Sequence, residues 1–155
     1  MTNYKFYIQQ CTKEGVMIDG TKRDLEADFD GLRYAKCEGL NSYGATKNIY
    51  TEKYADSETL RAYVPDEVLR EATEIKFTFY IFGDASKRQS TLDAFIAYLD
   101  SGKYFYYWDT ARKRRFMFIP PTSVIAPSDE LWYAGNPYFK FELTLQNMKG
   151  YTEAI

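Results

Sequence analysis

The sequence contains no histidine among its 155 residues. This absence excludes serine–histidine and cysteine–histidine catalysis, metal sites of the His-Glu-x-x-His type and the usual proton shuttle at neutral pH. The two cysteines, Cys11 and Cys37, cannot build a standard zinc site without histidine. Since no export signal is visible, we expect two reduced, partly buried thiols, and a disulfide between them is the alternative.

Carboxylate chemistry remains open, because acidic residues are plentiful. Examples are Asp56 with Glu58 and Asp66 with Glu67. Nothing in the spacing singles out one pair, and charged side chains of this kind are mostly solvated. The sequence therefore does not favour an enzyme.

Long hydrophobic runs are also missing. Residues 94–99 form one of the longest runs, whereas a membrane helix needs about 20 residues. The N-terminal ten residues are polar and show no signal-peptide pattern. We expect a soluble protein, or a component assembled in a cytoplasm, with no membrane partner.

Neither sign of charge dominates the chain. Lys and Arg total 20 and Asp and Glu total 22, so the net charge is −2. A dedicated nucleic-acid protein takes most of its affinity from neutralising phosphates, so this balance argues against one. The basic run 112–115 lies beside aromatic residues, as in single-strand binders, but such charges also keep a sheet edge soluble. We expect no nucleic-acid partner.

One short stretch imitates a phosphate-binding loop. Gly39 and Gly44 have the spacing of its two glycines, but the lysine that should follow at once is displaced by two positions, to Lys47. We interpret residues 39–44 as a glycine-containing turn.

Aromatic residues are abundant, with 15 Tyr and 11 Phe. They are typical of pleated, half-buried sheet surfaces and also of protein–protein interfaces. Alternating side chains predict strands at 4–10, 32–37, 49–54, 59–64, 75–82, 104–108, 114–119 and 138–145. The strands 104–108 and 114–119 are separated by a turn-sized break and should form a hairpin.

The one long helix is predicted over residues 86–101. Leu92, Phe95, Ile96 and Leu99 recur at helical spacing and form one apolar stripe. Ser86 and Gln89 have the spacing of a capping box, and Gly102 stands where a helix stops. A short helix is predicted over 66–72, a loop over 127–136 and a loose tail from Met148.

These elements predict an α+β fold. We expect mainly antiparallel strands in a β-sandwich or barrel-like sheet, with one packed amphipathic helix, in a single domain of residues 1–155. A loop or hairpin over 41–64 would protrude from it. One face of the strand 104–108 belongs to the core, and the other face needs a second cover.

The order of elements over 74–147 carries a resemblance. An alternating strand ends in a glycine turn (EIKFTFYIFGDAS), and a helix follows (KRQSTLDAFIAYLDSG). An aromatic strand pair (KYFYYWDTARKRRFMFI) and a late strand (YFKFELTLQN) complete the series. This order resembles the N-terminal domain of the distal tail proteins of long-tailed bacteriophages, and more broadly the tail-tube fold.

The resemblance implies a structural subunit of a phage or prophage tail, without catalysis and without a cofactor. Such subunits form hexameric rings with one another and bind other phage tail proteins. They are assembled in the bacterial cytoplasm and reside in the virion tail. The resemblance leaves a distal-tail, tube or adaptor role open. It also implies that an insertion between early strands reaches a neighbouring subunit. The segment 41–64 would be that insertion and would form an interface with the neighbour. Its candidate residues are Tyr43, Ile49, Tyr50, Tyr54 and Tyr63. The alternative is an ordinary hairpin packed on its own domain.

A second hypothesis is a carbohydrate- or ligand-binding module. Exposed aromatic rings offer a flat apolar face with a polar handle, on which a sugar ring can stack. The candidates are Trp108, Trp132 and Tyr133, together with Tyr104 and Tyr106.

Overall fold

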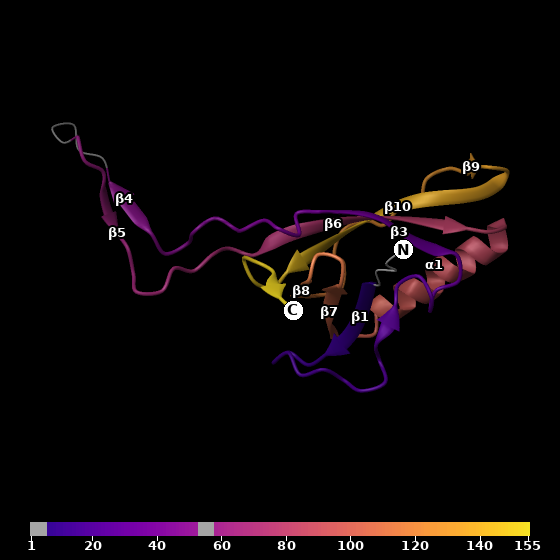
Figure 1. The fold of residues 1–155 in the computed structure, drawn as a ribbon, viewed down its shortest axis with the longest axis horizontal. Coiled ribbons are helices and arrows are strands. Elements are labelled where there is room, and N and C mark those ends of the chain that lie inside the picture. Colours follow the sequence, from indigo (N-terminus) through magenta and orange to yellow (C-terminus); the bar gives the residue numbers. More distant parts are fainter. Residues whose placement is uncertain (1–5, 53–57) are drawn as a thin grey trace.

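The computed structural model describes residues 6–52 and 58–155. They form one strongly bent antiparallel sheet, one helix and a long two-stranded arm (Figure 1). The strands of the sheet are β1 (Phe6–Cys11), β2 (Arg23–Asp24), β3 (Leu32–Glu38), β6 (Thr73–Phe82), β7 (Tyr104–Asp109), β8 (Arg114–Phe118), β9 (Leu131–Tyr133), β10 (Asn136–Asn147) and β11 (Glu153–Ala154). Strands β4 (Tyr50–Glu52) and β5 (Arg61–Tyr63) form the separate sheet of the arm.

The strand order in the large sheet is β2-β1-β7-β8-β10-β6-β3, with β11 beside β8 and β9 beside β10. Strands β8 and β10 pair through Asn147 and Phe118, so the sheet divides there into two halves. Side chains of the two halves pack on each other, as Phe77 does on Tyr107 with 4.8 Å between ring centroids. The expected α+β fold with antiparallel strands and one helix is confirmed, and the sheet is open rather than a closed barrel.

Strands β6 and β10 form the centre of one half. Their alternation puts every second residue into the core, and Phe79 stacks on its partner Phe141 at 5.4 Å. The inward sets predicted from the sequence are buried: Ile75, Phe77, Phe79 and Ile81 on β6, and Phe139, Phe141, Leu143 and Leu145 on β10.

The aromatic hairpin β7–β8 forms the centre of the other half. Phe105 and Tyr107 face the core, as the alternation predicts. Tyr106 points to the opposite face and is also buried, because the loop after β1 covers it. Gly15 of that loop lies so close that a Cβ there would be 3.2 Å from the Tyr106 hydroxyl. The second face of β7 is therefore covered by a loop of the same chain.

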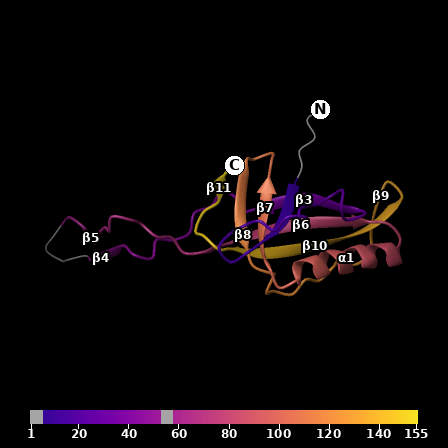
Figure 2. The same cartoon turned by 90° about the horizontal axis from the view of Figure 1, so that it is seen from below.

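Helix α1 (Ala85–Leu99) packs beside β10 and β6 (Figure 2). Phe95 meets Phe79 at 5.6 Å, and Leu92 and Leu99 are buried with it. The predicted capping box is wrong. Asp84 is the N-cap, and its carboxylate accepts a 2.9 Å hydrogen bond from the Lys87 amide, which leaves no such role to Ser86 and Gln89.

Two other local predictions are also wrong. Residues 66–72 form no helix, because their backbone groups bond across to residues 45–48 instead of along the segment. The predicted loop 127–136 contains β9, which turns into β10 through Ala134 and Gly135, both at positive φ.

The tail from Met148 is not loose. Strand β11 pairs Glu153 with Arg115 of β8, and the Thr152 hydroxyl donates a 2.8 Å hydrogen bond to the carbonyl of Leu40. Local sequence pattern does not predict this anchoring, since it depends on partners far away in the chain.

Replacing Phe77 with alanine should destabilise the fold by about 3–5 kcal/mol, because Phe77 joins both halves of the core and its loss leaves a cavity. The measurement is chemical denaturation followed by circular dichroism. Val124→Ala, at a side chain 89 % exposed, is the matched control and should change the free energy of unfolding by less than about 0.5 kcal/mol. Equal effects of the two substitutions would contradict the described core.

Candidate interaction site

The arm comprises residues 41–52 and 58–72 and stands off the body of the protein (Figure 1). Near its root the two chain segments are held by backbone hydrogen bonds from Lys47 to Leu69 (3.1 Å) and from Glu71 to Ala45 (2.8 Å). Further out, β4 and β5 pair in register, with Tyr50 opposite Tyr63. The arm is thus an antiparallel ribbon of two segments.

The arm exposes an unusual amount of apolar surface. Of 15 large hydrophobic side chains that are exposed in the described part of the chain, seven lie on it: Tyr43, Tyr50, Leu60, Tyr63, Val64, Val68 and Leu69. A two-stranded hairpin without a covered face is marginally stable in water. Apolar surface gathered on such an element makes the arm a candidate interaction site.

The predicted interface residues fall on this arm. Tyr50 and Tyr63 are cross-strand partners and are 68 % and 63 % exposed. Tyr43 lies exposed at the root and Ile49 is half-buried, while Tyr54 lies outside the described residues. The structure therefore brings two of the five side chains into direct register, and their role as an interface stays a prediction.

At the root, the arm and the loop after β10 border a groove. The groove is lined by Tyr43, Lys47, Glu67, Val68, Leu69, Arg70, Met148, Lys149, Gly150 and Tyr151. The Tyr43 and Tyr151 rings stack at 6.4 Å, and the Arg70 guanidinium lies over the Tyr43 ring at 5.6 Å. Arg70 and the 148–151 loop were not among the predicted site residues, because the sequence predicts a short helix over 66–72 and a loose tail from Met148.

Two glycines hold this groove together. The Gly44 amide donates a 2.7 Å hydrogen bond to the carbonyl of Gly150. A Cβ on Gly44 would lie 1.9 Å from the Glu71 carbonyl oxygen, and one on Gly150 would lie 2.5 Å from Cβ of Arg70. Only residues without a side chain allow the three segments to approach this closely.

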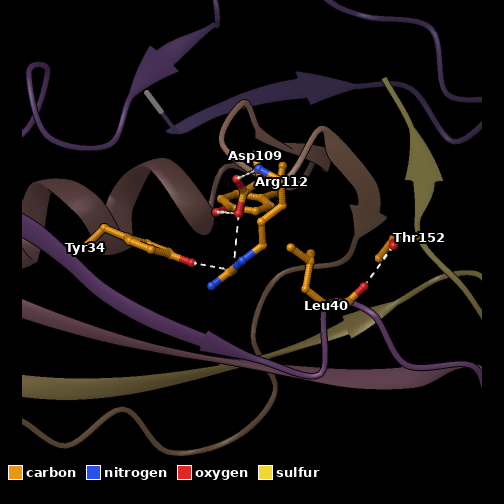
Figure 3. Close-up of polar contacts among 6 residues, drawn as sticks. Tyr34, Leu40, Asp109, Arg112 and Thr152 are labelled. Carbon is orange, nitrogen blue, oxygen red and sulfur yellow. Dashed lines mark hydrogen bonds and ion pairs between the residues drawn. The ribbon is translucent and has the colours of Figure 1, made fainter. Parts of the chain in front are cut away.

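A partly buried polar cluster around Asp109 links the two halves of the sheet (Figure 3). Asp109, whose side chain is fully buried, accepts hydrogen bonds from the Arg112 amide (2.9 Å) and guanidinium (3.3 Å) and from the Tyr107 hydroxyl (3.3 Å). The same guanidinium donates to the Tyr34 hydroxyl of β3 at 3.2 Å. These residues satisfy one another, so the cluster has the character of a structural link.

The cluster is also unsuited to nucleophilic chemistry at neutral pH. Burial raises the pKa of Tyr34 to about 12 and that of the neighbouring Cys37 thiol to about 11. Burial raises the pKa of Cys11 to about 11 in the same way. The thiolate is the reactive form of cysteine, so both thiols are held in the unreactive form. Both cysteines are free, as expected.

The predicted ligand-stacking residues do not form one platform. Trp108 on β7 is half-buried, and Arg115 and Lys22 lie 5.1 Å and 5.9 Å from its ring. Trp132 and Tyr133 are exposed on β9, which lies apart from β7 (Figure 1). Being adjacent on one strand, Trp132 and Tyr133 point to opposite faces.

The sequence matches no protein-family model and no curated protein. Within residues 6–52 and 58–155, no three Cys, Asp or Glu side chains gather in a way that could hold a metal ion. No helix in the same part of the chain is long and apolar enough to cross a membrane.

The raised pKa values predict a loss of stability in alkali. Unfolded thiols and phenols release their protons at lower pH than Cys37 and Tyr34 do when folded. The stabilisation is complete below about pH 9 and is lost as the pH rises toward 12, because the unfolded state then binds fewer protons. We expect the free energy of unfolding to fall by about 1 kcal/mol or more between pH 8 and pH 11. Urea titrations at several pH values measure this change.

Cys37→Ser is the control for the alkaline effect. Removing one buried thiol should make the decline between pH 9 and pH 11 shallower. A urea midpoint of the unsubstituted protein that stays constant up to pH 11 would show that these groups titrate normally.

Proposed function

We propose that this protein is a structural subunit of a phage or prophage tail, which assembles with copies of itself into a ring and carries out no catalysis. The observation that carries the proposal is the arm, a ribbon whose exposed tyrosines have no cover within the described chain. Tyrosine is enriched at protein interfaces, where it supplies a large contact area at low entropic cost. An arm of this kind serves to reach a neighbouring molecule.

The order of elements in the body supports the same proposal. Strand β6, helix α1, hairpin β7–β8 and strand β10 follow one another as in the resemblance to distal tail proteins. By that resemblance the ring is a hexamer in the virion tail, bound to other tail proteins. The partly buried polar cluster supports a non-enzymatic role, because its side chains are engaged with one another.

The test is the mass of the particle formed by the protein and by the double variant Tyr50→Ala/Tyr63→Ala. Light scattering over a concentration series should show a discrete assembly of the unsubstituted 18.1 kDa chain, and electron microscopy should show rings. The variant should assemble at least about 30-fold more weakly, since an interface hot spot contributes about 2 kcal/mol or more.

Tyr133→Ala is the matched control, because Tyr133 is 70 % exposed but lies on β9 and not on the arm. Its assembly should equal that of the unsubstituted protein. A protein that stays monomeric at high concentration, alone and with tail partners, would overturn the proposal.

A second candidate function is the binding of a carbohydrate at β9. Trp132 is 64 % exposed on this short strand, although it does not share a platform with Trp108. If β9 binds sugars, a glycan screen should show binding that Trp132→Ala abolishes and that Trp108→Ala leaves unchanged, because Arg115 and Lys22 already flank the Trp108 ring. Binding that survives Trp132→Ala would exclude this site.

A further inference from the structure

We infer that the groove at the root of the arm is the receptor for the β4–β5 hairpin of a second copy of this chain, so that each arm lies along the root of the next. This inference rests on the proposed function and names the surface that receives the arm. It involves two different surfaces of one molecule, the hairpin as donor and the groove as acceptor. Contacts of this heterologous kind close into a ring when the rotation between copies permits it.

The groove has the surface chemistry of a receptor. Its lining includes five exposed apolar side chains, which are Tyr43, Val68, Leu69, Met148 and Tyr151. The Tyr43 ring is held in place by the Tyr151 ring and the Arg70 guanidinium, so this side of the groove is fixed. The contact between Gly44 and Gly150 fixes both sides of the groove before any partner arrives, and a preformed site costs less ordering on binding.

The occupant is not the hairpin of the same chain. The β4–β5 hairpin lies at the opposite end of the arm from its root, in both views (Figures 1 and 2). The backbone bonds between residues 45–47 and 69–71 keep the two segments of the arm paired where the arm leaves the body. A hairpin that fills this groove therefore belongs to another molecule.

The two surfaces are complementary in charge. The hairpin offers Tyr50 and Tyr63 side by side, with Leu60 half-exposed near them in sequence. Its described residues carry Glu52, Glu58 and Arg61, which gives one net negative charge. The lining of the groove contains Lys47 and Arg70 against one acid, Glu67, while Lys149 is paired with Glu153. Opposite net charges favour encounter in the correct orientation.

Each surface also lacks what the other supplies. In the described residues the hairpin is a two-stranded sheet without a third strand or a core of its own, and the groove exposes apolar side chains among charged ones. Docking would cover the tyrosine pair and the groove lining in a single contact.

The experiment is covalent capture between the two surfaces. In a Cys37→Ser background, Ala62→Cys is placed on the hairpin and Val68→Cys in the groove, while the native Cys11 is fully buried. A flexible bismaleimide should then join the copies into a ladder of multimers on a denaturing gel. In mixtures of the two single variants, the product should stop at the dimer. Ala62→Cys alone should give no cross-linked product, because the proposed contact is not between two hairpins.

Ala62→Cys paired with Val124→Cys is the matched control, since Val124 is 89 % exposed but lies outside the groove. It should give at least tenfold less cross-linked product. Leu69→Asp should weaken assembly at least tenfold without changing the thermal midpoint, because it puts a charge into the groove and removes nothing from the core.

The outcomes separate this inference from the proposed function. Rings without cross-links between residues 62 and 68 would overturn the groove as receptor and leave the ring proposal intact. Cross-linked open chains without rings would support the groove as the receptor of the hairpin and would count against the proposal of a ring. If neither rings nor cross-links form, the groove inference and the ring proposal both fail. A ladder that Leu69→Asp abolishes supports the inference.

Discussion

The packing of aromatic rings between the two halves of the sheet is the interaction on which the rest of the structure depends. Strands β10 and β8 of the two halves pair through the residues Asn147 and Phe118, so hydrogen bonding alone fixes the angle between the halves poorly. Phe77 meets Tyr107 across the core, and the Tyr34–Arg112 contact joins β3 to the β7–β8 turn. Apolar burial thus supplies the strength of the fold, and the polar cluster adds a directional constraint that rings alone do not provide.

The arm depends on this core through the loop after β10. That loop leaves the sheet at Asn147, passes the arm at Gly150 and returns to the sheet as β11 beside β8. The Thr152 hydroxyl binds the Leu40 carbonyl where the arm begins (Figure 3). The direction of the arm is therefore set by the same strands that enclose the core, and a flexible hinge is not required to explain its position.

Sequence pattern predicted the elements that bury one regular face. Strands β6 and β10 and helix α1 were found because their apolar side chains recur at fixed spacing. Strand β9 was missed because its turn uses Ala134 at positive φ, where glycine or asparagine is the usual signal. Of the interaction site, the tyrosines of the arm could be chosen in advance. The groove could not, because it exists only where Gly44 meets Gly150.

The contact between Thr152 and Leu40 joins residues 112 positions apart in the chain. During translation the whole arm emerges well before the segment that anchors its root. Until residue 152 has left the ribosome, the ribbon has a tip but neither a fixed direction nor a completed groove. Chains still being synthesised on one messenger therefore lack the completed groove, even when they are crowded together. The order of synthesis restricts this groove to chains whose body has already closed.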